Sequence, residues 1–312
     1  MPWGKDSKSN RALTGRSTIG RPVTPFFCSM PSLTDFAPYI DRWALTPDGE
    51  PIATGGARLL PVQWQGQPAM LKIALADEER RGFDVLAWWS GKGAAQVFAR
   101  DEDHAGQAIL MERACGTRSL AQMSVASLED DDAATDILCT AVAGLHRWSE
   151  AQPRSQAMSA SLVALPGWFR ALDESVETTV PEPYAVLLRH ARAALRELLA
   201  EPRDVRVLHG DVHHQNLLDF GARGWLFIDP KGLVGERGFD YANLFCNPDA
   251  RSALDPLRFH ARLLRVSRQA QLPRERLLQW IVAWTGLSAV WHLEDGGSPD
   301  IALGVMELAL QA

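Results

Sequence analysis

The sequence lacks the marks of a secreted, membrane-spanning or disulfide-built protein. Its four cysteines, Cys28, Cys115, Cys139 and Cys246, are scattered without paired spacing, so neither a disulfide framework nor a zinc site is indicated. Its longest apolar runs are far shorter than the ~20 residues that a membrane helix requires. Because the thiols suit a reducing compartment and no membrane segment is visible, we expect a cytoplasmic protein that does not bind membranes.

The first part of the chain lacks apolar periodicity and is rich in Ser, Gly, Pro and basic residues. A signal peptide needs an apolar core of ~7–15 residues and a small-residue cleavage site, and neither is present. We expect residues 1–30 to be a disordered extension, or sequence upstream of a start at Met30. Residues 1–29 carry a charge of +4, so the rest of the chain carries −10. This acidic body argues against nucleic acid as a partner and mildly favours a cationic ligand.

The remaining composition is that of an ordinary globular protein. With 312 residues, 46% hydrophobic and 22% charged, the chain is long enough for two lobes with sizeable cores. No internal repeat is visible. Apolar spacing and turn residues predict a first part rich in strands, with one helix around Phe36 to Trp43 and another whose buried stripe is Phe83, Leu86 and Trp89, and then a part rich in helices. The predicted strands are Pro51–Thr54, Ala57–Trp64, Pro68–Ala74, Ala94–Arg100 and Ala108–Met111. The predicted helices after them are Ala133–Glu150, Pro183–Ala200, 255–270 and 275–294, with Glu129–Asp132 as an acidic linker.

One stretch, Leu208 to Asp229, combines polar residues in an order that suggests catalysis. Asp211 and Asn216 stand five residues apart, which is the Asp-x-x-x-x-Asn spacing of a kinase catalytic loop. Two short apolar runs around a Gly-containing turn follow, and they predict a β-hairpin. The second strand of that hairpin would deliver Asp229 beside Asn216.

These residue types match what phosphoryl transfer requires. The reaction needs a carboxylate that orients the acceptor hydroxyl and takes its proton, together with oxygen ligands for Mg²⁺ on the nucleotide phosphates. Asp211 would be the catalytic base, while Asn216 and Asp229 would hold the metal. The alternative is an Asp-rich turn that caps a hairpin, with solvated histidines. That alternative suits any single carboxylate, whereas the ordered set favours catalysis.

The same residues carry a family resemblance. His209-Gly210-Asp211, Asn216 and Ile228-Asp229 resemble the signature of the aminoglycoside phosphotransferases. The run from Ile228 to Asn243 resembles one branch, the aminoglycoside/hydroxyurea antibiotic resistance kinases, which includes streptomycin 6-phosphotransferases. The resemblance extends from about Met30 to the C-terminus.

The resemblance implies a fold and an activity. The fold would be α+β, bilobal and protein-kinase-like, with a small antiparallel-sheet N-lobe at 31–113 and a larger, mainly helical C-lobe at 114–312. The activity would be ATP- and Mg²⁺-dependent phosphorylation of a hydroxyl on a small molecule, such as the aminoglycoside streptomycin. Asp240 would hold the catalytic-loop backbone. Because Gly210 replaces the Arg of protein kinases and no Ala-Pro-Glu follows Asp229, we expect neither activation-loop control nor a protein substrate.

Nucleotide-binding residues are predicted in the first lobe. Lys72, in the strand Ala69–Ile73, resembles the kinase lysine that holds the α- and β-phosphates; a solvated lysine on an edge strand is the alternative. Glu79, or Glu78 beside it, would pair with Lys72. The main chain of Glu112 and Ala114 would contact adenine at the hinge. The turn Thr54-Gly55-Gly56 lacks the Gly-x-Gly-x-x-Gly pattern, so an ordinary hairpin turn is an equal reading.

Several readings stay open at this level. The same machinery would serve hydroxyurea, a sugar or an amine, and a nucleotide-binding pseudokinase is a further alternative. The pseudokinase is disfavoured because the base, the metal ligands and the lysine are all present. His146 is expected to be structural. Glu294 and Asp295 could face a cationic acceptor, or could simply be exposed at a helix end. The sequence names neither the acceptor hydroxyl nor the oligomeric state.

Overall fold

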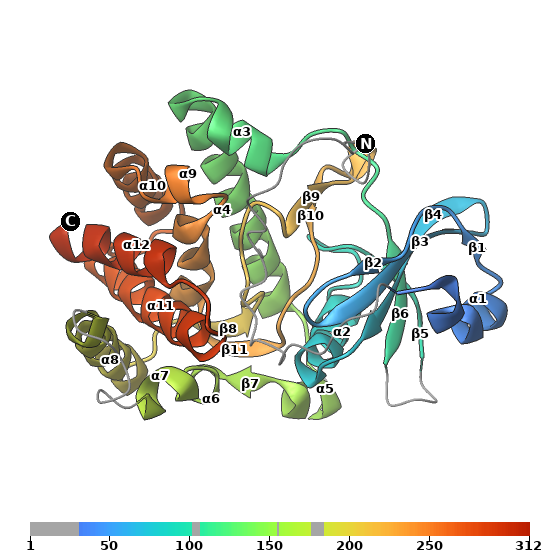
Figure 1. Cartoon of the computed structure of the whole chain (residues 1–312), viewed down its shortest axis with the longest axis horizontal. Coiled ribbons are helices and arrows are strands. Elements are labelled where there is room, and N and C mark those ends of the chain that lie inside the picture. Colours follow the sequence, from blue (N-terminus) through green and yellow to red (C-terminus); the bar gives the residue numbers. More distant parts are fainter. Residues whose placement is uncertain (1–30, 102–106, 155, 176–183) are drawn as a thin grey trace.

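The computed structural model describes residues 31–101, 107–154, 156–175 and 184–312. A small sheet with flanking helices lies on the right of Figure 1, and a larger, mainly helical part lies on the left. This arrangement confirms the predicted α+β fold, in which an antiparallel sheet precedes a helical part. The predicted extension, residues 1–30, lies outside the described residues.

The first lobe is built on a six-stranded antiparallel sheet in the order β1-β3-β4-β6-β5, with β2 paired to β3. The hairpin between β3 and β4 turns at Gln65 and Gly66, which both have positive φ, as a two-residue turn that follows the twist of the strands requires. The strands are β1 (Thr46–Pro47), β2 (Ile52–Ala53), β3 (Ala57–Trp64), β4 (Gln67–Ala74), β5 (Val97–Arg100) and β6 (Ala108–Glu112).

Helices cover both sides of this sheet. Phe83, Leu86 and Trp89 form the buried stripe of α2 (Asp77–Trp89), as their spacing predicts, and they join the main core. A second, smaller core around Phe36 includes residues of α1 (Ala37–Trp43), which follows the short 3-10 helix η1 (Leu33–Asp35). The sheet is therefore buried between two apolar layers, which fixes the direction of side chains along β4.

The second lobe is mainly helical. It contains α3 (Leu120–Ala126), α4 (Leu128–Ala151), α5 (Gln156–Ser161), α6 (Leu165–Trp168), α7 (Arg170–Glu174), α8 (Tyr184–Ala200), α9 (Ala250–Ala253), α10 (Pro256–Gln269), α11 (Arg274–Glu294) and α12 (Asp300–Gln311). Helix α11 is buried along almost its whole length and packs against α8 and α12. No helix of the described residues has the length and apolarity that crossing a membrane would take.

The predicted linker Glu129–Asp132 is wrong, because these residues form the first turn of α4. The Ser127 hydroxyl accepts a hydrogen bond from the main-chain N of Asp130 and caps the helix. Acidic side chains stabilise the positive end of a helix dipole, so the charges favour a helix start here. Ser127 and Asp130 also make the Ser-x-x-Asp pattern, a signal that the charge run obscured.

Two small sheets position the central loop. The hairpin β9 (Leu217–Asp219) and β10 (Trp225–Phe227) is antiparallel, as predicted. A three-stranded sheet joins β7 (Val163–Ala164), β8 (Val205–Leu208) and β11 (Leu233–Glu236). The short 3-10 helices η3 (Gly221–Arg223), η4 (Arg237–Tyr241) and η5 (Asn243–Cys246) complete this region. The loop 209–216 thus leaves β8 and enters β9, anchored at both ends by strands.

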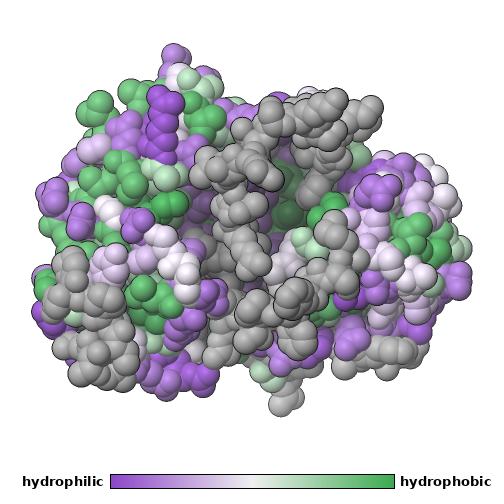
Figure 2. Space-filling view, viewed as in Figure 1, coloured by the Kyte–Doolittle hydropathy of each residue, from purple (hydrophilic) through white to green (hydrophobic). Residues whose placement is uncertain are grey.

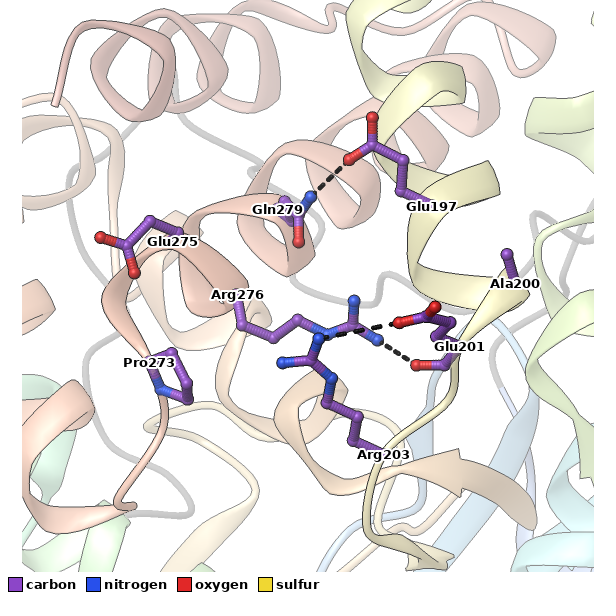
Figure 3. Close-up of a pocket in the computed structure, with 8 residues that line it drawn as sticks. All are labelled: Glu197, Ala200, Glu201, Arg203, Pro273, Glu275, Arg276 and Gln279. Atoms are coloured by element: carbon purple, nitrogen blue, oxygen red, sulfur yellow. Dashed lines mark hydrogen bonds and ion pairs between the residues drawn. The ribbon is translucent and has the colours of Figure 1, made fainter.

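A pocket of about 470 Å³ lies between the end of α8 and the start of α11 (Figure 3). Its polar groups bond to each other: Arg276 donates to the Glu201 carbonyl at 2.8 Å, and Gln279 donates to Glu197 at 2.7 Å. Arg276 is also buried against Glu236, at 2.6 Å. These bonds tie α8, α11 and β11 together, so we assign the pocket a structural role.

Candidate active site

A cleft of about 1340 Å³ lies between the two lobes. Figure 2 shows hydrophobic residues at the floor of a hollow between the sheet on the right and the helices on the left. Lining residues come from the sheet, from α2, from the loop 213–220 and from the ends of α11 and α12. Six of the seven predicted site residues line this cleft: Lys72, Glu79, Glu112, Ala114, Asn216 and Asp229. The seventh, Asp211, is buried and hydrogen-bonded to Asn216.

Buried Asp240 fixes the catalytic loop. Its carboxylate accepts hydrogen bonds from the main-chain N of His209 at 3.0 Å and of Gly210 at 2.7 Å. His146 Nε2 lies 2.7 Å from the same carboxylate. Two loop N–H groups therefore point at one buried acid, which holds the backbone before Asp211 in a single conformation. Asp240 and His146 have the structural contacts that their sequence context predicts.

The two oxygens of Asp211 are held from opposite sides. Asn216 Nδ2 donates to Oδ2 at 3.0 Å, and Asn243 Nδ2 donates to Oδ1 at 2.7 Å. Trp284 Nε1 in turn donates to Asn243 Oδ1 at 3.1 Å and orients its amide. The sequence predicted no role in the site for Asn243 or Trp284, because neither lies within the loop and Trp284 was expected among the apolar residues of a core helix. These two bonds orient the carboxylate.

Electrostatics keep Asp211 ionised. Burial by itself opposes ionisation, but nearby His213 and the Lys231 ammonium hold the pKa of Asp211 below its ordinary value. His213 Nε2 lies 3.7 Å from Asp211 Oδ2. The carboxylate can therefore accept a hydrogen bond from an incoming hydroxyl across the neutral pH range.

Lys72 lies at the centre of the sheet rather than on an edge. It pairs with Leu59 of β3 on one side and with Ile109 of β6 on the other, so the edge-strand alternative is wrong. Its ammonium forms short contacts with Glu79 Oε2 and Asp229 Oδ1. Of the two adjacent acids, Glu79 is thus the one that pairs with Lys72. Burial disfavours the charged amine, but Asp229 and Glu79 outweigh it and raise the pKa of Lys72.

Asp229 follows β10 and turns into the cleft with a positive φ of 63°. Ile228 N donates to the Asn216 carbonyl at 2.9 Å, which brings Asp229 and Asn216 together as the predicted hairpin requires. Burial opposes its ionisation, but Lys231 and Lys72 hold the pKa of Asp229 far below its ordinary value. Asp229 is therefore a fixed anion.

Lys231 is a buried cation that the sequence analysis missed. Its Nζ lies 3.3 Å from both Glu79 Oε1 and Asp229 Oδ2, 3.6 Å from Glu78 Oε1 and 3.9 Å from Asp211 Oδ2. Glu78 therefore faces Lys231 instead of Lys72, and burial raises its pKa. The sequence offered no signal for this position beyond its place two residues after Asp229.

The residues of this cluster fit a magnesium ion delivered with a nucleotide. Within the described residues, no group of three or more His, Cys, Asp or Glu is arranged to hold a metal by itself. Mg²⁺ usually takes only one or two protein carboxylates and completes its shell with phosphate oxygens and water. Asp229 and Asn216 offer that partial set. Their role as metal ligands stays a prediction.

The inner part of the cleft suits a flat, apolar ring. Apolar side chains line it, and β6 ends there at Glu112, which leads to buried Ala114. The Glu112 carboxylate is paired with Arg223. The main chain of Glu112 is therefore the candidate for contact with a ligand. The turn at Gly55 and Gly56 also lines the cleft. Adenine contacts at these positions stay a prediction.

The outer part of the cleft is lined by the second lobe. Asp249, Arg251, Ser288, His292 and Asp295 lie along it, whereas Glu294 does not line it. Ser288, His292 and Asp295 repeat at helical spacing toward the end of α11. Ser288 is buried, and its hydroxyl has no hydrogen-bond partner among the described residues. Burial lowers the pKa of His292.

Comparisons with known proteins agree with this geometry. Residues 42–296 match the family model described as aminoglycoside/hydroxyurea antibiotic resistance kinase. The chain is 47% identical to streptomycin 3''-kinase of Klebsiella pneumoniae over 82% of this chain and 92% of that protein. It is 32% identical to streptomycin 6-kinase of Streptomyces griseus, over 82% and 81%.

A solved structure shows the same fold at low identity. The aminoglycoside phosphotransferase APH(4)-Ia, in a ternary complex with ADP and hygromycin B, superposes with a TM-score of 0.61 at 12% identity. The match covers 88% of this chain and 97% of that one. The fold, the family model and the relatives all indicate the same family. The match to the family model alone spans well over half of the sequence. The chain belongs to the aminoglycoside/hydroxyurea antibiotic resistance kinase family.

Proposed function

We propose that this protein transfers the γ-phosphate of ATP to a hydroxyl of streptomycin in a Mg²⁺-dependent reaction. The observation that carries the proposal is the Asp211 carboxylate, clamped by Asn216 and Asn243 beside the Lys72–Asp229 pair. Such a carboxylate orients an acceptor hydroxyl and accepts its proton, while positioning and charge supply most of the catalysis.

Each predicted residue has a place in this scheme. Lys72, oriented by Glu79, would bind the α- and β-phosphates. Asn216 and Asp229 would hold Mg²⁺, which supplies charge neutralisation at the phosphates when bound. The main chain of Glu112 and Ala114 would bind adenine. Residues 31–113 would thus form the nucleotide-binding lobe, and residues 114–312 would carry the catalytic loop and the acceptor site.

The outer cleft suits a cationic acceptor. Streptomycin carries guanidinium groups, and Asp249 and Asp295 present carboxylates along the outer lining. Carboxylates bind guanidinium through paired, charge-assisted hydrogen bonds. The higher identity to the 3''-kinase than to the 6-kinase favours the 3''-hydroxyl as the site of transfer.

The test is a turnover assay with ATP, Mg²⁺ and a panel of acceptors. We expect ADP release to depend on streptomycin and the product to gain one phosphate, which mass spectrometry detects and NMR assigns to a hydroxyl. Asp211→Asn, an isosteric variant, is the matched control, and its acceptor-dependent release should be about 10²- to 10⁴-fold slower. Turnover of hydroxyurea without turnover of streptomycin would support the alternative substrate in the family's name. No acceptor-dependent release with any compound would contradict the proposal.

A further inference from the structure

Lysine is rare in this chain. Of its 32 Lys and Arg residues only five are Lys, and beyond residue 30 these are Lys72, Lys92 and Lys231. Lys92 is exposed, whereas the other two are buried in the cleft. Arginine presents a flat fork that matches one carboxylate, while lysine is a compact charge that fits among several oxygens. A lysine at 231 therefore indicates that a compact cation is required there.

The backbone of Lys231 is fixed by its neighbours. Its main-chain N donates to the His209 carbonyl at 2.8 Å. A Cβ atom on Gly82 of α2 would lie 2.0 Å from the Pro230 carbonyl oxygen, so only glycine allows this approach. A Cβ on Gly210, whose φ is +84°, would lie 3.1 Å from the Lys231 Cβ. Both glycines make room for the segment 229–231, and the lysine is held against the catalytic loop.

Among the described residues, no single carboxylate lies close to the Lys231 ammonium as its main partner. Its contacts with Glu78, Glu79, Asp211 and Asp229 range from 3.3 to 3.9 Å. A charge-assisted N–H···O bond between committed partners measures about 2.7–2.9 Å. A structural ammonium would be expected at that shorter distance from one or two carboxylates. Two of the three N–H donors of Lys231 make long hydrogen bonds of 3.3 Å, to Glu79 Oε1 and Asp229 Oδ2. Oxygen atoms of a ligand can therefore take over donors that no carboxylate holds closely.

The position of this ammonium matches the path of the transferred group. Lys231 spans Asp229, beside the expected nucleotide phosphates, and Asp211, beside the expected acceptor hydroxyl. Phosphoryl transfer places developing charge between the attacking and leaving oxygens. A fixed cation there stabilises the transition state without reorganising.

We propose that Lys231 binds the γ-phosphate of the nucleotide and stabilises the phosphoryl group during transfer. This inference rests on the proposed kinase function and adds a cation to Lys72, which would hold the α- and β-phosphates. In the structure this ammonium lies among four carboxylates, and phosphate oxygens would replace part of that contact in a nucleotide complex.

The experiment compares nucleotides that differ in the γ-phosphate, without any acceptor. Calorimetry gives Kd for the Mg²⁺ complexes of AMP-PNP, a non-hydrolysable ATP analogue, and of ADP. Because Lys231→Met alone unbalances the cluster, it is measured beside the double variant Lys231→Met/Glu78→Gln. Wild type has two lysines against four carboxylates, and the double variant has one against three, so the formal charge of −2 is kept. Glu78→Gln alone and Lys92→Met are the matched controls.

We expect the double variant to bind AMP-PNP about ten- to a hundredfold more weakly than Glu78→Gln does, the loss of one hydrogen bond to a charged group. Its ADP affinity should equal that of Glu78→Gln. Lys72→Met should weaken both nucleotides, and Lys92→Met neither. An equal loss for both nucleotides, or no loss, would overturn the proposal and leave Lys231 as a structural cation.

The design separates this inference from the proposed function. Failure of streptomycin as a substrate would contradict the proposed acceptor and leave the nucleotide measurement valid. Failure of wild type to bind either nucleotide would overturn the kinase proposal and the role of Lys231 with it. If Lys231→Met does not fold, the charge-balanced double variant gives the answer.

Discussion

Two buried ionic clusters in this protein use charge in opposite ways. Between α4 and α10, Arg262 and Asp131 are each only 1% exposed, and the guanidinium uses all its donors. It makes two bonds to Asp131, of 2.7 and 3.0 Å, one to Ser124 and two to main-chain carbonyls. This pair needs no ligand to complete its hydrogen bonds. The bonds join the elements on which the partners of Arg262 lie.

The cleft cluster is neither balanced nor saturated. Four carboxylates, Glu78, Glu79, Asp211 and Asp229, face the two lysines Lys72 and Lys231. Burial raises the pKa of Glu78, so its charged form is disfavoured at this position. Excess buried charge weakens a fold, so its presence indicates a site that a ligand completes. Both clusters are buried, so burial does not separate the structural cluster from the functional one. They differ in saturation, that is, in whether the hydrogen-bonding groups all have close partners within the protein.

The largest effect is expected from a change at Asp211, the proposed catalytic base in the cleft cluster. Asp211→Asn keeps the shape of the side chain but cannot accept a proton, so kcat should fall about 10²- to 10⁴-fold. Affinity for Mg·ADP and the melting temperature should stay near those of wild type. Asp229→Ala, in contrast, should raise the Mg²⁺ requirement and lower kcat together. Calorimetry with and without Mg²⁺ measures the nucleotide affinity of both variants. If Asp211→Asn lost nucleotide binding while Asp229→Ala kept it, the roles assigned to the two aspartates would have to be exchanged.

The next effect breaks the saturated cluster. Arg262→Met removes five hydrogen bonds and leaves Asp131 buried without its main partner. Breaking a buried pair on one side costs about 3–5 kcal/mol, so the free energy of unfolding should fall by that amount. Nucleotide Kd in the folded protein should not change, because Arg262 does not line the cleft. Urea denaturation measures the first and calorimetry the second. A loss under about 1 kcal/mol would show that burial alone contributes little here.

Local signals explain what the sequence could predict. The spacing of Asp211 and Asn216, the hairpin that follows and the strand around Lys72 are all set within a few residues. Their geometry therefore follows from turn chemistry and strand periodicity, and the structure places them in one cleft. Glu79 and Glu78 differ by one residue on a helix, about 100° of rotation, and only packing decides which faces Lys72.

Long-range packing explains what the sequence could not predict. Lys231 enters the cluster because Gly82 and Gly210, far apart in the chain, leave space for its segment. Asn243 reaches Asp211, and Trp284 reaches Asn243, because α11 packs against η5. No periodicity in the sequence specifies such contacts. The segment 300–311, for which no prediction was made, forms α12, which packs on α11.

A smaller effect is expected at His209 of the catalytic loop, where the pH dependence of stability tests the same comparison. His209 is saturated: Nδ1 accepts from Asp211 N at 3.2 Å, and Nε2 donates to the Ile228 carbonyl at 2.8 Å. Burial lowers its pKa, and a second proton would remove the bond at Nδ1. The folded pKa is thus below the unfolded value of about 6.5, so the unfolded chain binds more protons as pH falls. This contribution to stability is full above that value and is lost on acidification.

The measurement is the free energy of unfolding from pH 7.5 to 5. The contribution of one such group changes by at most about 1.4 kcal/mol per pH unit. His209→Gln should make the decline on acidification shallower than in wild type. His190→Gln, on an exposed face of α8, is the control and should keep the wild-type slope. Identical slopes for His209→Gln and wild type would show that His209 is not the group responsible.

The smallest effect tests saturation against burial on one helix. Arg265 lies three residues from Arg262 on α10 and also reaches α4, with bonds of 2.9 Å to Asp136 and 2.6 Å to Asp132. Its side chain is 35% exposed, and that of Asp136 is 40% exposed. Water screens such a pair, so Arg265→Met should lower the free energy of unfolding by only about 0–1 kcal/mol despite its short bonds.

Because the Debye length shrinks from about 10 Å at 0.1 M salt to about 3 Å at 1 M, that loss should shrink further in 1 M NaCl. The loss in Arg262→Met should persist, because its partners are out of reach of the salt. Urea denaturation of both variants at the two salt concentrations gives the four values. Equal losses at low salt, or equal sensitivity to salt, would mean that the number of bonds outweighs the exclusion of water.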